Sequence, residues 1–169
     1  MTLVVVIVGG LILLFGFVVA FGAPYVPSLR KEVAGSFKEL YPLSKKDLVV
    51  DLGSGDGSVL LTASRSGARC FGVELNPVLV LISRFRLRNR AQVKLGNMWL
   101  IPLLPQTTLV YVFTVSRDVK RLEKLLQSEA NRLNKEIFLM TFGAELPARQ
   151  PVKTRNAHSL YSFKPLQVY

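Results

Sequence analysis

The hydrophobic and polar positions divide the chain into two parts that meet near Arg30. From Leu3 to Phe21 the residues are apolar apart from glycines, and no Lys, Arg, Asp or Glu precedes Arg30. Beyond it, short apolar runs rich in β-branched residues alternate with stretches that repeat apolar residues every three or four positions. This alternation of strand and helix periods is typical of an α/β domain with a parallel sheet.

The apolar runs predict a Rossmann-like sheet of about six to seven strands. We expect strands at 47–52, 69–74, 92–99, 107–114 and 135–142, then a closing hairpin at 151–154 and 159–163. Helices are expected at 29–41, 58–64, 77–89 and 117–133. The third of these helices should bury Leu79, Ile82 and Phe85. No helix of useful length separates the fifth strand from the hairpin, so the sheet is a trimmed version of the fold.

A glycine-rich turn follows the first strand. Its three glycines lack a Cβ, so the backbone can turn tightly and approach a ligand closely. A dinucleotide-binding turn needs Gly-x-Gly-x-x-Gly, whereas here the third glycine, Gly57, comes one residue early. Asp51 at the strand tip would repel a pyrophosphate but suits a cationic amino-acid group. The next strand ends in Glu74, where a doubly wound fold places an acid for two ribose hydroxyls.

These residues resemble a known family. Asp51-Leu-Gly-Ser-Gly-Asp-Gly57 and Glu74 look like the first motif and the second-strand acid of class I S-adenosyl-L-methionine (SAM)-dependent methyltransferases. The alternative is a glycine-rich turn in another Rossmann-like domain. The resemblance implies SAM as cofactor and no metal. The cofactor-binding residues that it implies are Asp51, Leu52, Gly53, Ser54, Gly55, Asp56, Gly57, Glu74, Leu75, Asn76, Asn97 and Met98.

A narrower resemblance covers most of the chain from Ala23. Ala23-Pro-Tyr-Val-Pro-Ser28 and Gly72-Val-Glu-Leu-Asn-Pro77, with Ser83-Arg-x-Arg86 after them, are similar to membrane-anchored lysine N-methyltransferases that modify the c subunit of ATP synthase. In that family the first segment folds over the SAM and substrate sites. The resemblance therefore implies that Tyr25, Pro27 and Ser28 lie on the acceptor side. Asn97 stands where the family has an acid for the adenine.

The apolar N-terminal run predicts a membrane anchor. A helix that crosses the hydrocarbon core needs about 20 apolar residues, and the alternative, a cleavable signal peptide, would need a basic n-region. We expect an anchor at 1–22, a linker and lid helix at 23–46 and the catalytic domain at 47–169. Basic residues follow the run, so the positive-inside rule puts the domain on the cytoplasmic or mitochondrial matrix side.

The charge of the chain narrows the choice of partners. The net charge of +11 lies entirely after the apolar run and favours anionic surfaces, either lipid headgroups or nucleic acid. The fourth strand ends in Phe113-Thr-Val-Ser116 instead of the Asn/Asp-Pro-Pro-aromatic motif of nucleobase amino-methyltransferases, so a nucleic-acid acceptor is not favoured. The only cysteine, Cys70, excludes a cysteine metal cluster and an intramolecular disulfide.

The residues and the resemblance together predict a membrane-anchored protein-lysine N-methyltransferase. Its expected partners are the membrane bilayer and a lysine-bearing membrane protein. Two alternatives stay open at this point. One is a methyltransferase for a small molecule or a lipid headgroup. The other is a non-catalytic module of the same fold that recruits a partner to the membrane.

Overall fold

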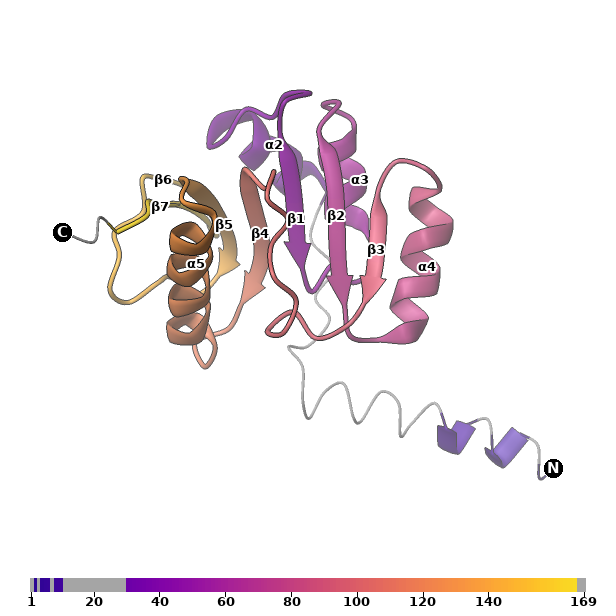
Figure 1. Ribbon diagram of the computed structural model, residues 1–169. Coiled ribbons are helices and arrows are strands. Elements are labelled where there is room, and N and C mark those ends of the chain that lie inside the picture. Colours follow the sequence, from indigo (N-terminus) through magenta and orange to yellow (C-terminus); the bar gives the residue numbers. More distant parts are fainter. Residues whose placement is uncertain (1, 3, 7, 11–29, 167–169) are drawn as a thin grey trace.

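The computed structural model describes residues 2, 4–6, 8–10 and 30–166 (Figure 1). The described chain contains one seven-stranded sheet in the order β3-β2-β1-β4-β5-β7-β6. The strands are β1 (Leu48–Leu52), β2 (Arg69–Glu74), β3 (Gln92–Leu95), β4 (Leu109–Thr114), β5 (Ile137–Gly143), β6 (Lys153–Arg155) and β7 (His158–Phe163). The helices are α2 (Arg30–Glu39), α3 (Ser58–Ser64), α4 (Pro77–Leu87) and α5 (Val119–Leu133). The predicted Rossmann-like sheet of six to seven strands is confirmed.

The sheet is organised around β1. All five residues of β1 are buried, and the strand pairs in parallel with β2 on one side and β4 on the other. β3 and β5 continue the parallel arrangement, whereas β7 runs antiparallel to both of its neighbours, β5 and β6. The strand order reverses between β1 and β4, and in such sheets ligands bind at the carboxyl ends of the strands beside that reversal. The glycine turn begins at this place.

Helices cover both faces of the sheet (Figure 1). Buried side chains of α2, α3 and α4 form one apolar cluster with alternate residues of β1, β4 and β5. A second cluster, on the other face, joins α5 to the remaining strand residues. Residues 96–108 connect β3 to β4 without a helix, and Trp99 from this connection packs under the guanidinium of Arg121, 4.3 Å from the ring centroid. The connection therefore takes the place of a helix over part of the second face.

Helix α4 differs from its prediction. Val80, Ser83 and Leu87 are its buried residues, whereas Ile82 and Phe85 are 43% and 83% exposed. The cause is the glycine turn, against which this face of α4 packs. A Cβ at Gly57 would lie 3.0 Å from Cδ1 of Leu87 and 3.1 Å from Cβ of Ser83. The helix therefore turns its second apolar stripe to the outside.

The predicted membrane anchor is not supported. Within residues 2, 4–6, 8–10 and 30–166, no helix is long and apolar enough to cross a membrane, and residues 11–22 of the predicted anchor lie outside the described part. An apolar run in the sequence shows only that a segment avoids water, whereas a transmembrane helix also needs about 20 residues in one continuous helix. On this finding, the predictions of a transmembrane helix and of a single-pass protein with its domain on the cytoplasmic or matrix side are wrong.

Candidate functional site

The glycine turn after β1 is fixed to the end of β2. Gly53 and Ser54 donate their backbone N–H groups to the carbonyl oxygen of Val73 at 2.8 and 3.0 Å. Gly53 and Gly57 have φ values of 82° and 78°, in the left-handed region that side chains with a Cβ disfavour. A Cβ at Gly53 would meet no atom of the described chain within 4 Å. The turn is thus closed on the side of α4 and open at Gly53.

The carboxylate of Glu74 joins the two neighbouring strand ends. Its Oε2 accepts the N–H of Gly55 at 2.8 Å, and its Oε1 accepts the N–H of Asn76 at 2.7 Å. Glu74 is buried, and hydrogen bonds to an ionised acceptor are stronger than neutral ones. A carboxylate has about four lone-pair sites, so both oxygens keep the capacity to accept a further hydrogen bond. The acid that the sequence placed beside the glycine turn lies there.

Asn76 continues from Glu74 into α4. Its side-chain Oδ1 accepts the N–H of Val78 at 2.9 Å and caps the helix, and Pro77 occupies the first helical position. The carbonyl oxygen of Glu74 accepts the N–H of Gly96 at 2.9 Å. The end of β3 is thereby tied to the end of β2. The predicted site residues on these three strand ends are brought together.

The end of β3 carries the two remaining predicted cofactor residues. Asn97 is exposed, and its Oδ1 accepts the N–H of Trp99 at 3.0 Å. Met98 is partly buried against the second apolar cluster. Leu75, between Glu74 and Asn76, is half-buried. The site thus has an amide and two partly covered apolar side chains beside the buried acid.

Arg86 holds the glycine turn from α4. Its Nη1 donates to the carbonyl oxygen of Asp56 at 3.1 Å and to Oγ of Ser58 at 2.8 Å, and it forms an ion pair with Oδ2 of Asp56. Oδ1 of Asp56 accepts the N–H of Ser58 at 3.0 Å. Asp56 is therefore engaged inside the turn. Arg86 was absent from the predicted site, although the motif Ser83-Arg-x-Arg86 contained it.

The buried end of the turn is acidic. Asp51 is 2% exposed, and in the described part of the chain neither its Oδ2 nor Oγ of Ser54 has a hydrogen-bond partner. Burial raises the pKa of Asp51 well above its usual range, and the negative charges of Glu74 and Asp56 raise it further. A cationic ligand group beside Asp51 would favour its ionised form. The residues therefore fit a ligand that carries hydroxyl groups together with a positive charge.

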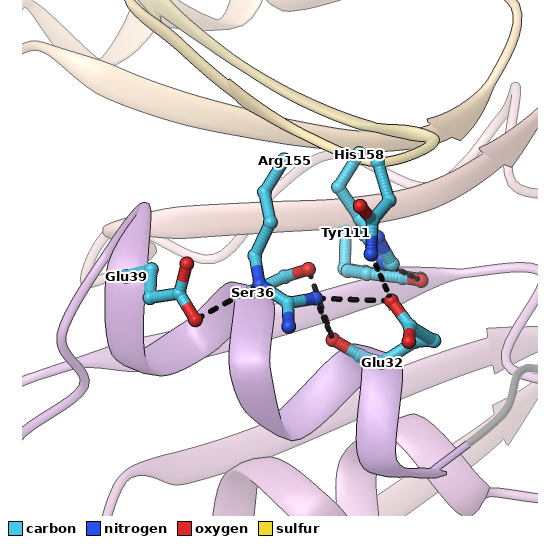
Figure 2. Close-up of polar contacts among 7 residues, drawn as sticks. Glu32, Ser36, Glu39, Tyr111, Arg155 and His158 are labelled. Atoms are coloured by element: carbon cyan, nitrogen blue, oxygen red, sulfur yellow. Dashed lines mark hydrogen bonds and ion pairs between the residues drawn. The ribbon is translucent and has the colours of Figure 1, made fainter.

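A cluster that the sequence did not reveal holds α2 against the β6–β7 hairpin (Figure 2). The guanidinium of Arg155 pairs with Glu32 and with Glu39, both at 3.0 Å, and Nδ2 of Asn156 donates to Oε2 of Glu32 at 2.6 Å. A Cβ at Gly35 would lie 2.6 Å from Cζ of Arg155, so glycine is required for this approach. More than 110 residues separate the partners in the sequence, which explains why no local pattern predicted the cluster.

His158, at the start of β7 in the same hairpin, lies next to this cluster and is buried. Its Nε2 is hydrogen-bonded to the hydroxyl of Tyr111 at 3.0 Å, and the two side chains point toward each other in Figure 2. Burial lowers the pKa of His158 to about 4, so the imidazole is neutral at pH 7. His158 pairs in register with Phe142 at the carboxyl end of β5. The hairpin therefore meets the sheet at the same edge as the glycine turn.

The predicted acceptor-side residues Tyr25, Pro27 and Ser28 lie outside the described residues. α2 begins at Arg30, two residues after Ser28. Because Glu32 in its first turn is bound to the hairpin, α2 begins near the edge of the sheet that carries the candidate site. The roles of these three residues stay predictions.

The strand order, the glycine turn at the reversal point and the acid on the neighbouring strand define the fold of class I SAM-dependent methyltransferases. An RNA methyltransferase from Salinibacter ruber, solved with S-adenosyl-L-homocysteine, superposes with a TM-score of 0.73. It covers 85% of this chain and 97% of its own at 20% identity, so the likeness concerns the fold. A geranyl diphosphate methyltransferase in complex with SAM matches 66% of this chain with a TM-score of 0.53.

The chain belongs to the family of the ANTKMT methyltransferase domain, whose family model matches residues 51–153. It is 35% and 32% identical over 111 residues to the ATP synthase c-subunit lysine N-methyltransferases of Xenopus laevis and Homo sapiens. It spans about half the length of these relatives, 48% and 46%. A protein-lysine N-methyltransferase of Saccharolobus islandicus is 30% identical over 113 residues. The predicted family resemblance is confirmed, and the cofactor class predicted from the sequence is that of the family.

Proposed function

We propose that this protein transfers a methyl group from SAM to the side-chain amine of a lysine in a protein substrate. The observation that carries the proposal is the bridge from Gly55 through Glu74 to Asn76, in a domain of the ANTKMT methyltransferase family. Relatives are named as lysine N-methyltransferases of the ATP synthase c subunit. Their names support the c subunit, or a similar small membrane protein, as the substrate of this chain.

The proposed cofactor site uses the three strand ends. Glu74 accepts hydrogen bonds from the two ribose hydroxyls through its remaining lone pairs. Asp51 and Ser54 face the amino-acid part of SAM, because their unpartnered oxygens match its ammonium group. Gly53 and Gly55 carry no Cβ, so the ligand can approach the backbone closely. Leu52 lies beneath the turn as a buried apolar residue. Asn97 would offer its side-chain amide to the adenine, and Leu75 and Met98 would supply apolar contacts to it.

The chemistry asks little acid–base work of the protein. Bound SAM would supply an electrophilic methyl group on a sulfonium, which the neutral nitrogen of the acceptor lysine would take as the methyl–sulfur bond breaks. Fixed proximity and orientation contribute about 7–11 kcal/mol to such reactions. The acceptor lysine must lose its proton first, and apolar surroundings favour the neutral amine. Tyr25, Pro27 and Ser28 are proposed to line the acceptor side, which agrees with the attachment of the first turn of α2 to the hairpin.

A transfer assay tests the proposal. The full chain is incubated with methyl-labelled SAM and membranes that contain ATP synthase, and label is followed in protein, lipid and small-molecule fractions. We expect label in protein, and a loss of at least about tenfold with Glu74→Gln because a charged hydrogen-bond acceptor is removed. The control is Glu136→Gln, directly before the amino-terminal end of β5 and therefore at the edge of the sheet opposite the candidate site. Label only in lipid or in a small molecule would favour the small-acceptor alternative, and absence of SAM binding would favour the non-catalytic one.

A further inference from the structure

Helix α4 exposes a continuous apolar stripe. Leu81, Ile82 and Phe85 are 67%, 43% and 83% exposed, and Val78 before them is half-buried. The spacing of these positions, i, i+3, i+4 and i+7, places them on one face of the helix. The opposite stripe packs inward against the glycine turn and the sheet. α4 is thus apolar on two sides, and among residues 30–166 only one of these sides packs against the fold.

The exposed apolar area continues beyond the helix. β3 is the edge strand of the sheet beside α4, and Leu95 at its end is 50% exposed. Scattered exposed leucines are ordinary on protein surfaces, but large apolar residues that gather on neighbouring elements mark an interaction surface.

The charge around this area has one sign. Between Pro77 and Gly96 the chain contains five basic residues and no acidic residue: Arg84, Arg86, Arg88, Arg90 and Lys94. Arg86 is bound in the glycine turn, and Arg84 donates to the carbonyl oxygen of Val93, which fixes α4 to β3. Arg88 and Arg90, which follow the carboxyl end of α4, are exposed, whereas Lys94 lies on the other face of β3 because its neighbour Val93 packs on the side of α4. An apolar helix face bordered by such a group is typical of a helix that lies at the surface of an anionic membrane.

We propose that the exposed face of α4, with the adjoining end of β3, docks on an anionic lipid surface. Phe85 and Leu81 enter the boundary between headgroups and acyl chains, and Arg88 and Arg90 pair with lipid phosphates. The charge of the face selects this occupant: an uncharged apolar partner leaves the basic residues without counterions, and a second copy of this chain places like charges together. This is a peripheral contact of the folded domain, independent of methyl transfer.

A fluorescent label tests the surface at one position at a time. Phe85→Cys is labelled with an environment-sensitive dye in the full chain, and the only native cysteine, Cys70, is buried. The matched control is Val152→Cys, which is also exposed but lies next to β6, at the opposite edge of the sheet. We expect a blue-shifted, brighter emission at position 85 with phosphatidylglycerol vesicles, little change with phosphatidylcholine vesicles, and none at position 152 with either.

The basic residues are tested separately. Arg88→Gln combined with Arg90→Gln is expected to lower partitioning onto phosphatidylglycerol vesicles by about tenfold or more, because each basic residue near the surface contributes. The far-ultraviolet circular dichroism of each variant confirms that it is folded. An emission at position 85 that does not change with vesicles, changes equally at 152, or changes with protein concentration in the absence of lipid would overturn the proposal. The last of these outcomes would indicate self-association instead.

Discussion

The N–H of Gly55 donates to Oε2 of Glu74 at 2.8 Å, across 19 positions of the sequence. This bond joins the turn after β1 to the end of β2. The same carboxylate also accepts the N–H of Asn76 at 2.7 Å. Glu74 therefore orders the turn through hydrogen bonds within the chain, and a site ordered in this way loses less conformational entropy on binding.

Replacing Glu74 separates its structural role from its role toward SAM. Glu74→Gln keeps the shape but removes the charge and one acceptor, so we expect a destabilisation of about 1–3 kcal/mol from a poorly satisfied buried hydrogen bond. The affinity for SAM should fall by about tenfold or more. Urea unfolding measures the first quantity and calorimetric titration the second. Unchanged SAM affinity in a variant with the expected loss of stability would restrict Glu74 to structure.

Arg86 is expected to act as a positioning residue. Arg86→Ala removes the donor that holds Asp56 and Ser58, so the KM for SAM should rise by about tenfold while kcat falls less, because the turn binds the cofactor and touches no reacting atom. Arg86→Lys restores the charge without the geometry of the guanidinium and should rescue only in part. Arg65→Ala, at an exposed position directly after α3, is the control. Equal effects of the lysine and alanine variants on kcat alone would contradict this assignment.

Asp51 gives SAM binding a dependence on pH. Its raised pKa means that lowering the pH protonates it before an ordinary aspartate, and the neutral acid attracts the ammonium group less. We therefore expect SAM affinity to fall on acidification. Asp51→Asn should bind SAM about tenfold less tightly and lose that dependence. Calorimetric titrations over a range of pH values measure both, and a variant with the same pH profile as the wild type would exclude Asp51.

The same group affects stability with the opposite sign. The folded-state pKa of Asp51 lies above its unfolded value, so the folded state binds more protons and this contribution to stability decreases as pH rises between the two values. Without SAM, Asp51→Asn should therefore have a higher melting temperature than the wild type near neutral pH. Thermal scans in the presence and absence of SAM distinguish this gain from the loss of ligand stabilisation. A lower melting temperature of the variant without SAM would contradict the prediction.

His158 contributes to acid sensitivity. Its folded pKa of about 4 lies below the unfolded value near 6.5, so the unfolded state binds more protons between them. The contribution of His158 to the free energy of unfolding is fully present above pH 6.5, the pKa in the unfolded state. It falls as the pH is lowered toward 4, by on the order of 3 kcal/mol. His158→Gln should flatten this part of the curve of unfolding free energy against pH. Denaturant unfolding at several pH values measures it, and parallel curves would exclude His158 as the cause.

The contact between Arg155 and α2 should influence the acceptor more than the cofactor. Arg155→Ala removes the ion pairs to Glu32 and Glu39 and leaves the hydrogen bond from Asn156 to Glu32, and Gly35→Ala pushes the guanidinium away. In both variants we expect the KM for the protein acceptor to rise several-fold, because α2 is no longer held in place and must be ordered when the acceptor binds. The affinity for SAM should stay unchanged. Lys153→Ala, exposed on the same hairpin, is the control. A parallel loss of SAM affinity would show that α2 supports the cofactor site instead.

The parts of the fold that the sequence predicted correctly are those set by local patterns. The helix at Ser58–Ser64 and the acid at Glu74 followed from a glycine turn between two apolar strands, where adjacent residues determine the conformation. The burial of α4 could not be read in this way. Both of its faces are apolar, and the choice depends on Gly57, which is distant in sequence from Leu87 and makes room for it.

Long-range polar contacts were also beyond the sequence. Arg155 and Glu32 are each ordinary surface residues by local pattern, and only the return of β7 beside β5 brings them together. The apolar N-terminal run shows a different limit, because hydropathy predicted a helix across a membrane that the described residues do not contain.

The central claim is transfer to a lysine, and the most direct measurement locates the methyl group. The purified c subunit of ATP synthase is incubated with the full chain and methyl-labelled SAM, and fragments are sequenced by tandem mass spectrometry. We predict label on a lysine side chain, absent when that lysine is replaced by arginine and strongly reduced with Glu74→Gln. Label on another residue type, or label that persists after the lysine is replaced, would contradict the account.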